Sequence, residues 1–308
     1  MPIYDAIVIG GSAAGLSATM SLSRALANVV CIDSGRPCNR WTSESHNFIT
    51  HDGENPAHIK SVAREQLEKY ERTTFIDDSV TILEKRDVDS IFKVVTEQNG
   101  EILGKYLILA TGVDDGVERS SIKGIERFFG NSVIHCPYCH GYEFAGGKAG
   151  LFLQNPVLLK HMIPTLYNWN KDLTVFSSID ALNEFGIDEL KKKGIKTYTE
   201  PIIKLNGDAP YLKSVTLASG DQIDLDVLYT ILDPIVNLKE QIAQLGVEFG
   251  EDGLIKTEKP FQNTNISGVF AAGDCQSFMR SLVVSTYSGQ MAGVGVAHSL
   301  QVSQWSNV

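Results

Sequence analysis

Two cysteines separated by two residues, Cys136 and Cys139, form the segment of this chain best suited to chemistry. Thiols at this spacing can close a small disulfide, and a neighbouring titratable group can set which sulfur becomes the thiolate. His140 follows directly and titrates near neutral pH, so it could act as a general acid or base or hold a thiolate by its charge. By itself, the pattern fits a redox pair, half of a zinc site or a coincidence.

Two rival interpretations of the Cys-x-x-Cys-His string are weak. Covalent attachment of a c-type haem uses the same five residues, but the chain opens on a strand without a recognisable signal peptide. A zinc site needs a second pair of ligands, and His161, Cys275 and His298 are scattered along the chain. We therefore expect no metal ligands and interpret the two cysteines as a redox-active disulfide.

A glycine-rich turn near the N-terminus predicts a dinucleotide site. Gly10 and Gly15 follow an apolar strand and open a helix, in an approximate G-x-G-x-x-G pattern with Ser12 at the second glycine. Such a turn lets the backbone and the helix N-terminus approach a pyrophosphate, and Asp33 ends the next strand, where a ribose-binding carboxylate belongs. The alternatives are a tight structural turn and a plain turn aspartate. The strand–turn–helix context favours the cofactor.

Composition excludes several classes of partner. The 308 residues are 43% hydrophobic and 21% charged with a net charge of −10, which is typical of a globular protein and unfavourable for nucleic acid or anionic membranes. No apolar run is long enough to span a bilayer, and we expect a cytoplasmic location. Five cysteines in such a chain are no disulfide framework. Cys31 reads as a buried hydrophobe, whereas the sequence assigns no role to Cys38 or Cys275.

The elements that must position these residues follow from hydrophobic patterning. The pattern predicts a strand–helix–strand unit at the N-terminus, antiparallel strands after it, a polar connector near residues 113–123, and a second unit with its own strands and helices. The expected strands are 6–9, 29–33, 80–85, 92–97, 105–110, 148–153, 173–176, 196–198, 215–217 and 222–225. The expected helices are 13–27, 56–70, 157–169, 179–193 and 281–301.

Four motifs in order make the resemblance to a known family specific. The Gly10–Gly15 turn, Ala110-Thr111-Gly112, the cysteine pair and Gly273-Asp274 fall in the order and spacing of the low-molecular-weight thioredoxin reductases, and the likeness covers nearly the whole chain. The resemblance implies an α/β fold. Its FAD-binding, Rossmann-like three-layer ββα domain comprises residues 1–115 and 245–308, and a smaller nicotinamide-domain-like insertion at 116–244 carries the cysteines. It also implies a homodimer that acts on a thiol or disulfide protein or on a small dithiol.

The resemblance further implies roles for individual residues. Cys139 would face the flavin, Cys136 would attack the external disulfide, and Asp274 would bind the ribityl chain. Asn47 matches the family's flavin-loop asparagine, while Arg280-Ser281 stands where relatives have Arg-Gln. The expected catalytic residues are Cys136, Cys139 and His140, and the expected FAD-binding residues are Gly10, Ser12, Ala13, Ala14, Gly15, Asp33, Asn47, Ala110, Thr111, Gly112, Gly273, Asp274, Arg280 and Ser281.

The inserted segment lacks the features of a nicotinamide site. Its strand at 149–153 runs into Gln154-Asn155-Pro156, where NADPH-dependent relatives have a second glycine-rich turn, and Pro156 has no N–H to offer an anion. No basic cluster for a 2′-phosphate follows Phe176. The segment Cys136–Glu143 also resembles oxidase-type members, which include flavin-dependent dithiol oxidases and diflavin-linked disulfide oxidoreductases with a second FAD.

We therefore predict an FAD-dependent disulfide oxidoreductase that works without NAD(P)H. The alternatives are an NADPH-dependent thioredoxin reductase with an atypical pocket and a flavin-binding redox sensor. The sequence leaves open the thiol substrate, the direction of electron flow and the terminal partner, which could be oxygen, a quinone, ferredoxin or a second flavin.

Overall fold

The computed structural model describes residues 2–86 and 91–306, which form two compact units. The first unit comprises Met1–Cys38, Ala57–Asp114 and Ile235–Val308. The second comprises Asn39–Pro56 and Asp115–Pro234. Within the ranges that are described, no helix has the length and apolar character needed to cross a membrane.

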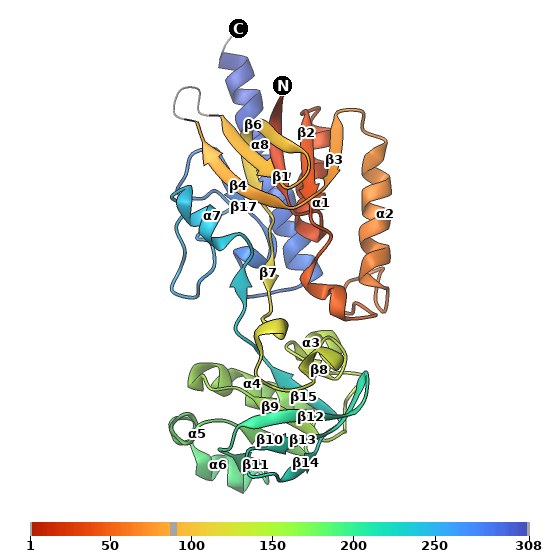
Figure 1. Ribbon diagram of the computed structural model, residues 1–308, viewed down its shortest axis with the longest axis vertical. Coiled ribbons are helices and arrows are strands. Elements are labelled where there is room, and N and C mark those ends of the chain that lie inside the picture. The colour runs from red at the N-terminus through yellow and green to blue at the C-terminus, as the bar shows by residue number, and fades with distance from the viewer. Residues whose placement is uncertain (1, 87–90, 307–308) are drawn as a thin grey trace. The chain divides into compact units, whose positions relative to one another are not determined.

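The first unit is built on a seven-stranded mixed sheet in the order β3-β2-β1-β6-β5-β4, with β17 paired to β6 (Figure 1). Strands β1, β2, β3, β6 and β17 are parallel, and β4 and β5 are antiparallel neighbours. The strands are β1 (Ile3–Ile9), β2 (Val29–Asp33), β3 (Thr73–Asp77), β4 (Val80–Lys85), β5 (Phe92–Thr96), β6 (Gly100–Leu109) and β17 (Val269–Ala271). The helices of this unit are α1 (Ala13–Arg24), α2 (Pro56–Glu68), α7 (Lys239–Gln244) and α8 (Leu282–Ser306).

Strand alternation divides the core of this unit into two layers. Ala6 and Val8 of β1 face a cluster that includes residues of α1 and α8, whereas Ile7 and Ile9 face a cluster with β4, β5 and α7. Successive side chains of a strand point to opposite faces, so a central strand that is apolar on both faces must be covered on both. The result is a three-layer arrangement, in which β4, β5 and α7 contribute to the core on one face of the parallel strands and α1 and α8 to the core on the other.

Small residues bring α8 against α1. A Cβ on Gly289 would lie 2.0 Å from the Ala14 carbonyl oxygen, and one on Gly293 would lie 2.5 Å from that of Ala18. The two glycines are four residues apart and therefore share a face of α8. This contact holds the helix that follows Asp274 against the helix that follows the Gly10–Gly15 turn.

The second unit holds a five-stranded parallel sheet in the order β11-β10-β9-β15-β8 and a three-stranded antiparallel sheet, β12-β13-β14. The parallel strands are β8 (Val133–Ile134), β9 (Ala149–Phe152), β10 (Leu173–Phe176), β11 (Lys196–Tyr198) and β15 (Val227–Thr230). The antiparallel strands are β12 (Ile202–Asp208), β13 (Tyr211–Leu217) and β14 (Gln222–Asp224), and the helices are α3 (Pro137–His140), α4 (Pro156–Trp169), α5 (Ile179–Phe185) and α6 (Ile187–Lys192).

Three features differ from the pattern expected from the sequence. The helix expected at 179–193 is two helices, because Gly186 adopts a φ of 114° between them. The second unit ends at Pro234 rather than at 244, because β16 (Ile235–Val236) pairs with β7 (Val113–Asp114) of the first unit. Residues 39–56 group with the second unit.

Candidate functional site

The glycines of the N-terminal turn are required by close backbone contacts. Gly10 has a φ of 102°, and a Cβ there would lie 2.1 Å from the Ala110 carbonyl oxygen. A Cβ on Gly15 would lie 1.7 Å from the Gly10 carbonyl oxygen. Both contacts are to backbone atoms, which cannot rotate away. The turn thus packs directly on the end of β6, as a dinucleotide-binding turn does.

The N-terminus of α1 has no side-chain cap from its N-cap residue. Ser12 is the N-cap residue, and among the described residues no side chain caps this end of the helix. The first N–H groups of a helix have no partner within it, and their partial positive charge favours an anion. The first two helical residues, Ala13 and Ala14, have small side chains. The end of the helix therefore fits the pyrophosphate of FAD.

Asp33 lies beside this turn, at the end of β2. A Cβ on Gly11 would lie 2.8 Å from the Asp33 Cβ, so the glycine gives the carboxylate its place next to the turn. The Asp33 carboxylate forms an ion pair with the Lys60 ammonium, and both side chains are largely buried. Lys60 lies on α2 and was not foreseen, because nothing in the sequence pairs a helix lysine with an acid 27 residues earlier.

Asp274 is held by three side chains. Its Oδ1 accepts a hydrogen bond from the Ser285 hydroxyl at 3.1 Å, and its Oδ2 accepts from the Arg280 Nε at 3.3 Å and from the Cys38 thiol at 3.3 Å. The neighbouring Gly273 N–H donates to the Ser288 hydroxyl at 2.9 Å. Arg280 was expected here, whereas Cys38 and Ser285 were missed.

The remaining flavin-motif residues of the first unit lie on neighbouring strand ends. The Ala110 N–H donates to the Ile9 carbonyl, and the Ala272 N–H donates to the Leu109 carbonyl. Because β1, β6 and β17 are parallel, their carboxyl ends meet at one edge of the sheet, where ligands of such folds bind. The expected residues that this edge brings together are Gly10, Ser12, Ala13, Ala14, Gly15, Asp33, Ala110, Thr111, Gly112, Gly273 and Asp274, with Arg280 and Ser281 between Asp274 and α8.

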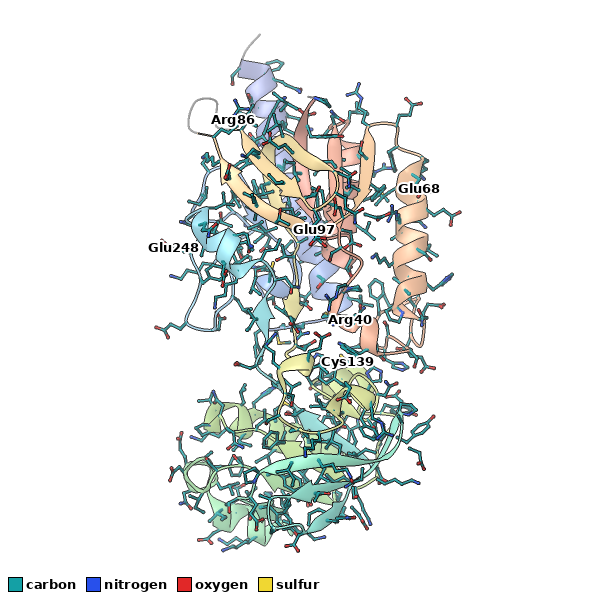
Figure 2. The ribbon with its side chains drawn as sticks, viewed as in Figure 1. Arg40, Glu68, Arg86, Glu97, Cys139 and Glu248 are labelled. Carbon is teal, nitrogen blue, oxygen red and sulfur yellow. The ribbon has the colours of Figure 1, made fainter. Side chains whose placement is uncertain are left out.

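The cysteine pair lies at the short helix α3 of the second unit, and Cys139 is labelled in Figure 2. Cys136 is the N-cap residue with an extended φ of −124°, Pro137 occupies the first turn, and the Cys139 N–H donates to the Cys136 carbonyl at 3.2 Å. Both cysteines are half-buried. Helix α3 follows β8 at the edge of the parallel sheet, so one turn of helix holds both sulfur-bearing residues on a rigid support.

His140 ends α3 in a confined polar environment. Its Nε2 lies 3.0 Å from the Thr42 hydroxyl, and that hydroxyl donates to the Glu44 carbonyl at 3.0 Å. Burial and, after it, the charge of His46 lower the pKa of His140, while Glu143 and Glu44 oppose the shift. The imidazole is therefore biased toward its neutral form.

The other thiols differ in their surroundings. Cys31 is fully buried, and burial raises the pKa of its thiol to about 12. Burial also raises the pKa of Cys275 to about 11, and its thiol donates to the Leu109 and Ala272 carbonyls. Both thiols are thus held in the unreactive protonated form. Cys38 is half-buried against Asp274.

Asn47 lies in a different unit from the flavin motifs of the sheet edge. It belongs to the loop of residues 39–56 in the second unit, is exposed, and adopts a φ of 60°. Its N–H donates to the Asp52 carboxylate at 2.7 Å. The second unit therefore brings together Asn47, Cys136, Cys139 and His140, while the other expected residues belong to the first unit.

In the second unit, a nicotinamide dinucleotide would bind at the N-terminus of α4. The N–H groups there donate hydrogen bonds to other residues of the chain instead. Asn155 caps α4, and its Oδ1 accepts from the Val157 N–H at 2.9 Å and the Leu158 N–H at 3.2 Å. Pro156, the first helical residue, has no N–H. The Gln154 Oε1 accepts from the Ser178 N–H at 2.8 Å, which engages the loop after β10 as well.

The chain is similar to curated thioredoxin reductases over nearly its whole length. The chain is 30% identical over 304 residues to thioredoxin reductase tcpT of Claviceps purpurea, covering 94% of this chain and 92% of that protein. It is 31% identical over 309 residues to thioredoxin reductase sirT of Leptosphaeria maculans, covering 96% and 93%.

Solved structures of similar proteins share this fold. A putative thioredoxin reductase TrxB from Bacillus anthracis superposes with a TM-score of 0.89 at 28% identity, covering 98% of this chain and 99% of that one. An oxidoreductase from Agrobacterium tumefaciens superposes with a TM-score of 0.87 at 33% identity, with the same coverage. The sequence matches the pyridine nucleotide-disulphide oxidoreductase family over residues 4–149 and 174–298. The chain is a thioredoxin reductase-like flavoprotein of the pyridine nucleotide-disulphide oxidoreductase family.

Proposed function

We propose that this oxidoreductase exchanges electrons between FAD, the Cys136–Cys139 disulfide and an external dithiol or disulfide, and that it does so without NAD(P)H. The observation that carries the proposal is the contrast between two helix N-termini. No described side chain caps α1, whereas the first N–H groups of α4 are absent at Pro156 or taken by Asn155. An anion at α4 would have to displace two hydrogen bonds that the chain already makes.

The residues of the first unit would hold the FAD. The α1 N-terminus and the Gly10–Gly15 turn fit the pyrophosphate, Asp33 a ribose, and Asp274 the ribityl chain. When bound, FAD supplies a two-electron acceptor or donor for the dithiol. A carboxylate held by Arg280 and Ser285 is already oriented, so little ordering is needed on binding.

The residues of the second unit would carry out thiol–disulfide exchange. A substrate thiolate forms a bond to the sulfur of Cys136, and the Cys136–Cys139 bond breaks with its electron pair on Cys139. A thiol must lose its proton before it attacks. The Thr42 hydroxyl donates its single hydrogen to the Glu44 carbonyl, so it accepts from the His140 Nε2–H. This bond leaves the His140 Nδ1 as the proton acceptor.

Anaerobic stopped-flow mixing tests the proposal. Dithiothreitol should bleach the flavin absorbance of the holoprotein, and the Cys136→Ser variant should not bleach. Excess NADPH should leave the wild-type spectrum oxidised over the same interval. Full bleaching by NADPH within a second would contradict the proposal and support an NADPH-dependent reductase. The relatives tcpT and sirT are named thioredoxin reductases.

Turnover separates an enzyme from a redox sensor. A catalytic amount of the protein should oxidise many equivalents of dithiol when oxygen, a quinone or ferredoxin is present as the acceptor. His140→Ala should slow dithiol-driven bleaching on the order of 10²-fold, because it removes the proton acceptor. The bleaching rate of this variant should also no longer rise with pH as His140 of the wild type loses its proton. A single stoichiometric reduction with no turnover by any acceptor would favour the sensor.

We also propose that the protein is a homodimer that associates through α8. Helix α8 is 25 residues long and carries no Asp, Glu, Lys or Arg, and its exposed apolar side chains include Val283, Tyr287, Val294 and Trp305. Two copies with a net charge of −10 repel each other elsewhere, so an uncharged face is where they can approach.

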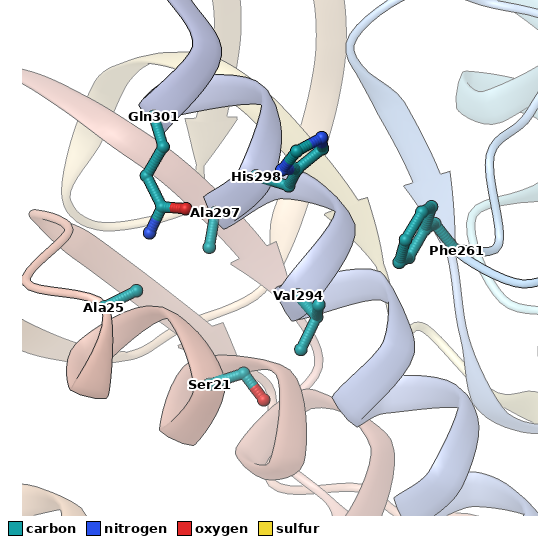
Figure 3. Close-up of a pocket in the computed structure, with 7 residues that line it drawn as sticks. All are labelled: Ser21, Ala25, Phe261, Val294, Ala297, His298 and Gln301. Carbon is teal, nitrogen blue, oxygen red and sulfur yellow. The ribbon is translucent and has the colours of Figure 1, made fainter. Parts of the chain in front are cut away.

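A depression lies on this face between α1 and α8, with an accessible volume of about 340 Å³. Figure 3 shows its lining, in which His298 stacks on Phe261. The lining residues are Ser21, Ala25, Phe261, Val294, Ala297, His298 and Gln301. Light scattering should give the mass of two chains for the wild type and of one chain for the Val294→Glu variant. A monomeric wild type would refute the dimer.

A further inference from the structure

A second histidine, His46, lies against His140 without being part of the Cys-x-x-Cys-His string. It belongs to the loop of residues 39–56, in the same compact unit as α3. The two rings meet edge to face, with centroids 5.4 Å apart and planes at 87°. The His46 side chain is 17% exposed, so the contact is largely removed from water. The two histidines are 94 positions apart in the sequence, which hides this pairing from any motif search.

Three carboxylates surround the His46 ring. Its Nε2 lies 3.5 Å from the Glu44 Oε2 and 3.6 Å from the Glu143 Oε1, and its Nδ1 lies 3.7 Å from the Asp52 Oδ1. The Nε2 is buried and makes no hydrogen bond to any part of the chain that the structure describes. A buried polar atom without a hydrogen bond has a cost that calls for an explanation, and an electrostatic role supplies one here.

The same groups act on His140 with opposite signs. The charge of His46 lowers the pKa of His140, in the same direction as burial, whereas Glu143 and Glu44 raise it. Glu143 and Cys136 also both contribute to a raised pKa of the buried Tyr229, whose main cause is burial. The protonation of His140 therefore depends on a balance between one imidazole and two carboxylates.

We propose that His46 is a positioning residue for the dithiol chemistry. It offsets part of the charge of Glu44 and Glu143, so that His140 stays neutral and can accept a thiol proton. The inference rests on the proposed function and deepens it. In the step concerned, the S–H bond breaks, the proton moves to the His140 Nδ1, and the electron pair stays on sulfur as the thiolate. Without His46, the two carboxylates would act on His140 uncompensated and would hold a proton on it.

Two substitutions that should shift the pH profile of flavin bleaching in opposite directions test the proposal. The measurement is the rate of anaerobic flavin bleaching by dithiothreitol in the holoprotein as a function of pH. In His46→Gln, the pH at which the rate rises should move by about 1 pH unit toward alkaline values, because the His140 pKa rises. In Glu143→Gln, it should move toward acidic values, because a carboxylate that stabilises the imidazolium is removed. His46→Lys restores a positive charge and should restore most of the wild-type profile.

His51→Gln is the matched control. It makes the same change in the same loop, at a histidine that stacks on Phe48, and the profile should not move. A folded, flavin-loaded His46→Gln protein whose profile is unchanged or moves toward acidic pH would overturn the proposal. So would equal shifts in the His46 and His51 variants.

A second readout keeps this inference separate from the proposed function. The C2–H resonance of His140, assigned by its loss in His140→Ala, reports the His140 pKa by NMR without any turnover. If dithiols fail to bleach the wild type, the proposed function fails, yet the NMR titration still decides the role of His46. A His140 pKa that is the same in wild type and His46→Gln would refute the electrostatic role whatever the activity.

Discussion

Replacing Asp274 by Ala should affect both folding and flavin binding, and the structure separates the two effects. The Asp274 and Arg280 side chains are 14% and 13% exposed, and their ion pair joins Oδ2 to Nε at 3.3 Å. Breaking a fully buried pair costs about 3–5 kcal/mol, and an exposed pair contributes at most about 1 kcal/mol. This pair is neither fully buried nor exposed, so the free energy that it contributes should lie between these two values. We therefore expect Asp274→Ala to lower the free energy of unfolding by about 1–3 kcal/mol.

A double-mutant cycle with Arg280→Ala measures the coupling between the two side chains. Urea unfolding of the flavin-free proteins should show that the double variant loses about 0.5–2 kcal/mol less than the sum of the single variants. Flavin affinity should behave differently. Asp274→Ala should weaken FAD binding about 10- to 100-fold, because a charge-assisted hydrogen bond is lost, and the second substitution should not restore it.

Glu65→Ala is the control for this cycle, since Glu65 is an exposed acid on α2 of the same unit. Its stability and flavin affinity should remain within experimental scatter of the wild type. The reasoning is refuted if Asp274→Ala binds FAD within twofold of the wild type. It is also refuted if the stability losses of Asp274→Ala and Arg280→Ala are strictly additive.

Three further predictions concern the capping, packing and thiols of the chain. Asn155→Ala should lower the free energy of unfolding by about 1 kcal/mol, because two N–H groups of α4 lose their acceptor, and urea unfolding of the variant measures this. Gly289→Ala should destabilise by about 1–3 kcal/mol in thermal unfolding although alanine favours helix, because the new Cβ would meet the Ala14 carbonyl; equal or higher stability would contradict this packing. In the reduced protein at pH 8, iodoacetamide should label the α3 cysteines well before Cys31 and Cys275, whose thiols are buried with raised pKa values, and peptide mass spectrometry would expose the opposite order.

Local patterns in the sequence predicted much of the fold because they act over short distances. Alternation and apolar runs identified many strands of both units, including the hairpin of β13 and β14, but they missed β3, β8, β12 and β15. The Gly10–Gly15 turn and Asp33 predicted a dinucleotide site at one edge of the sheet, since a strand, a turn and a helix are contiguous in the chain. The helix expected at 179–193 was wrong, because one glycine with a left-handed φ ends α5.

Tertiary structure decided what depends on residues far apart in the chain. The ion pair of Lys60 with Asp33, the contact of Cys38 with Asp274 and the place of His46 beside His140 each require folding to bring two segments together. Their side chains have no local signature, because lysines, cysteines and histidines occur in many surface loops.

The start of α4 in the second unit shows most plainly what the sequence determined and what the tertiary structure decided. The sequence by itself determined that Gln154-Asn155-Pro156 lacks the glycines of a phosphate-binding turn, since glycine alone permits a close backbone approach. Only the tertiary structure decided what those residues do instead. Asn155 takes the N–H groups of α4, and Gln154 reaches the Ser178 N–H beyond the next strand. Backbone hydrogen-bond donors at a helix start need acceptors, and the folded chain determines which ones they find.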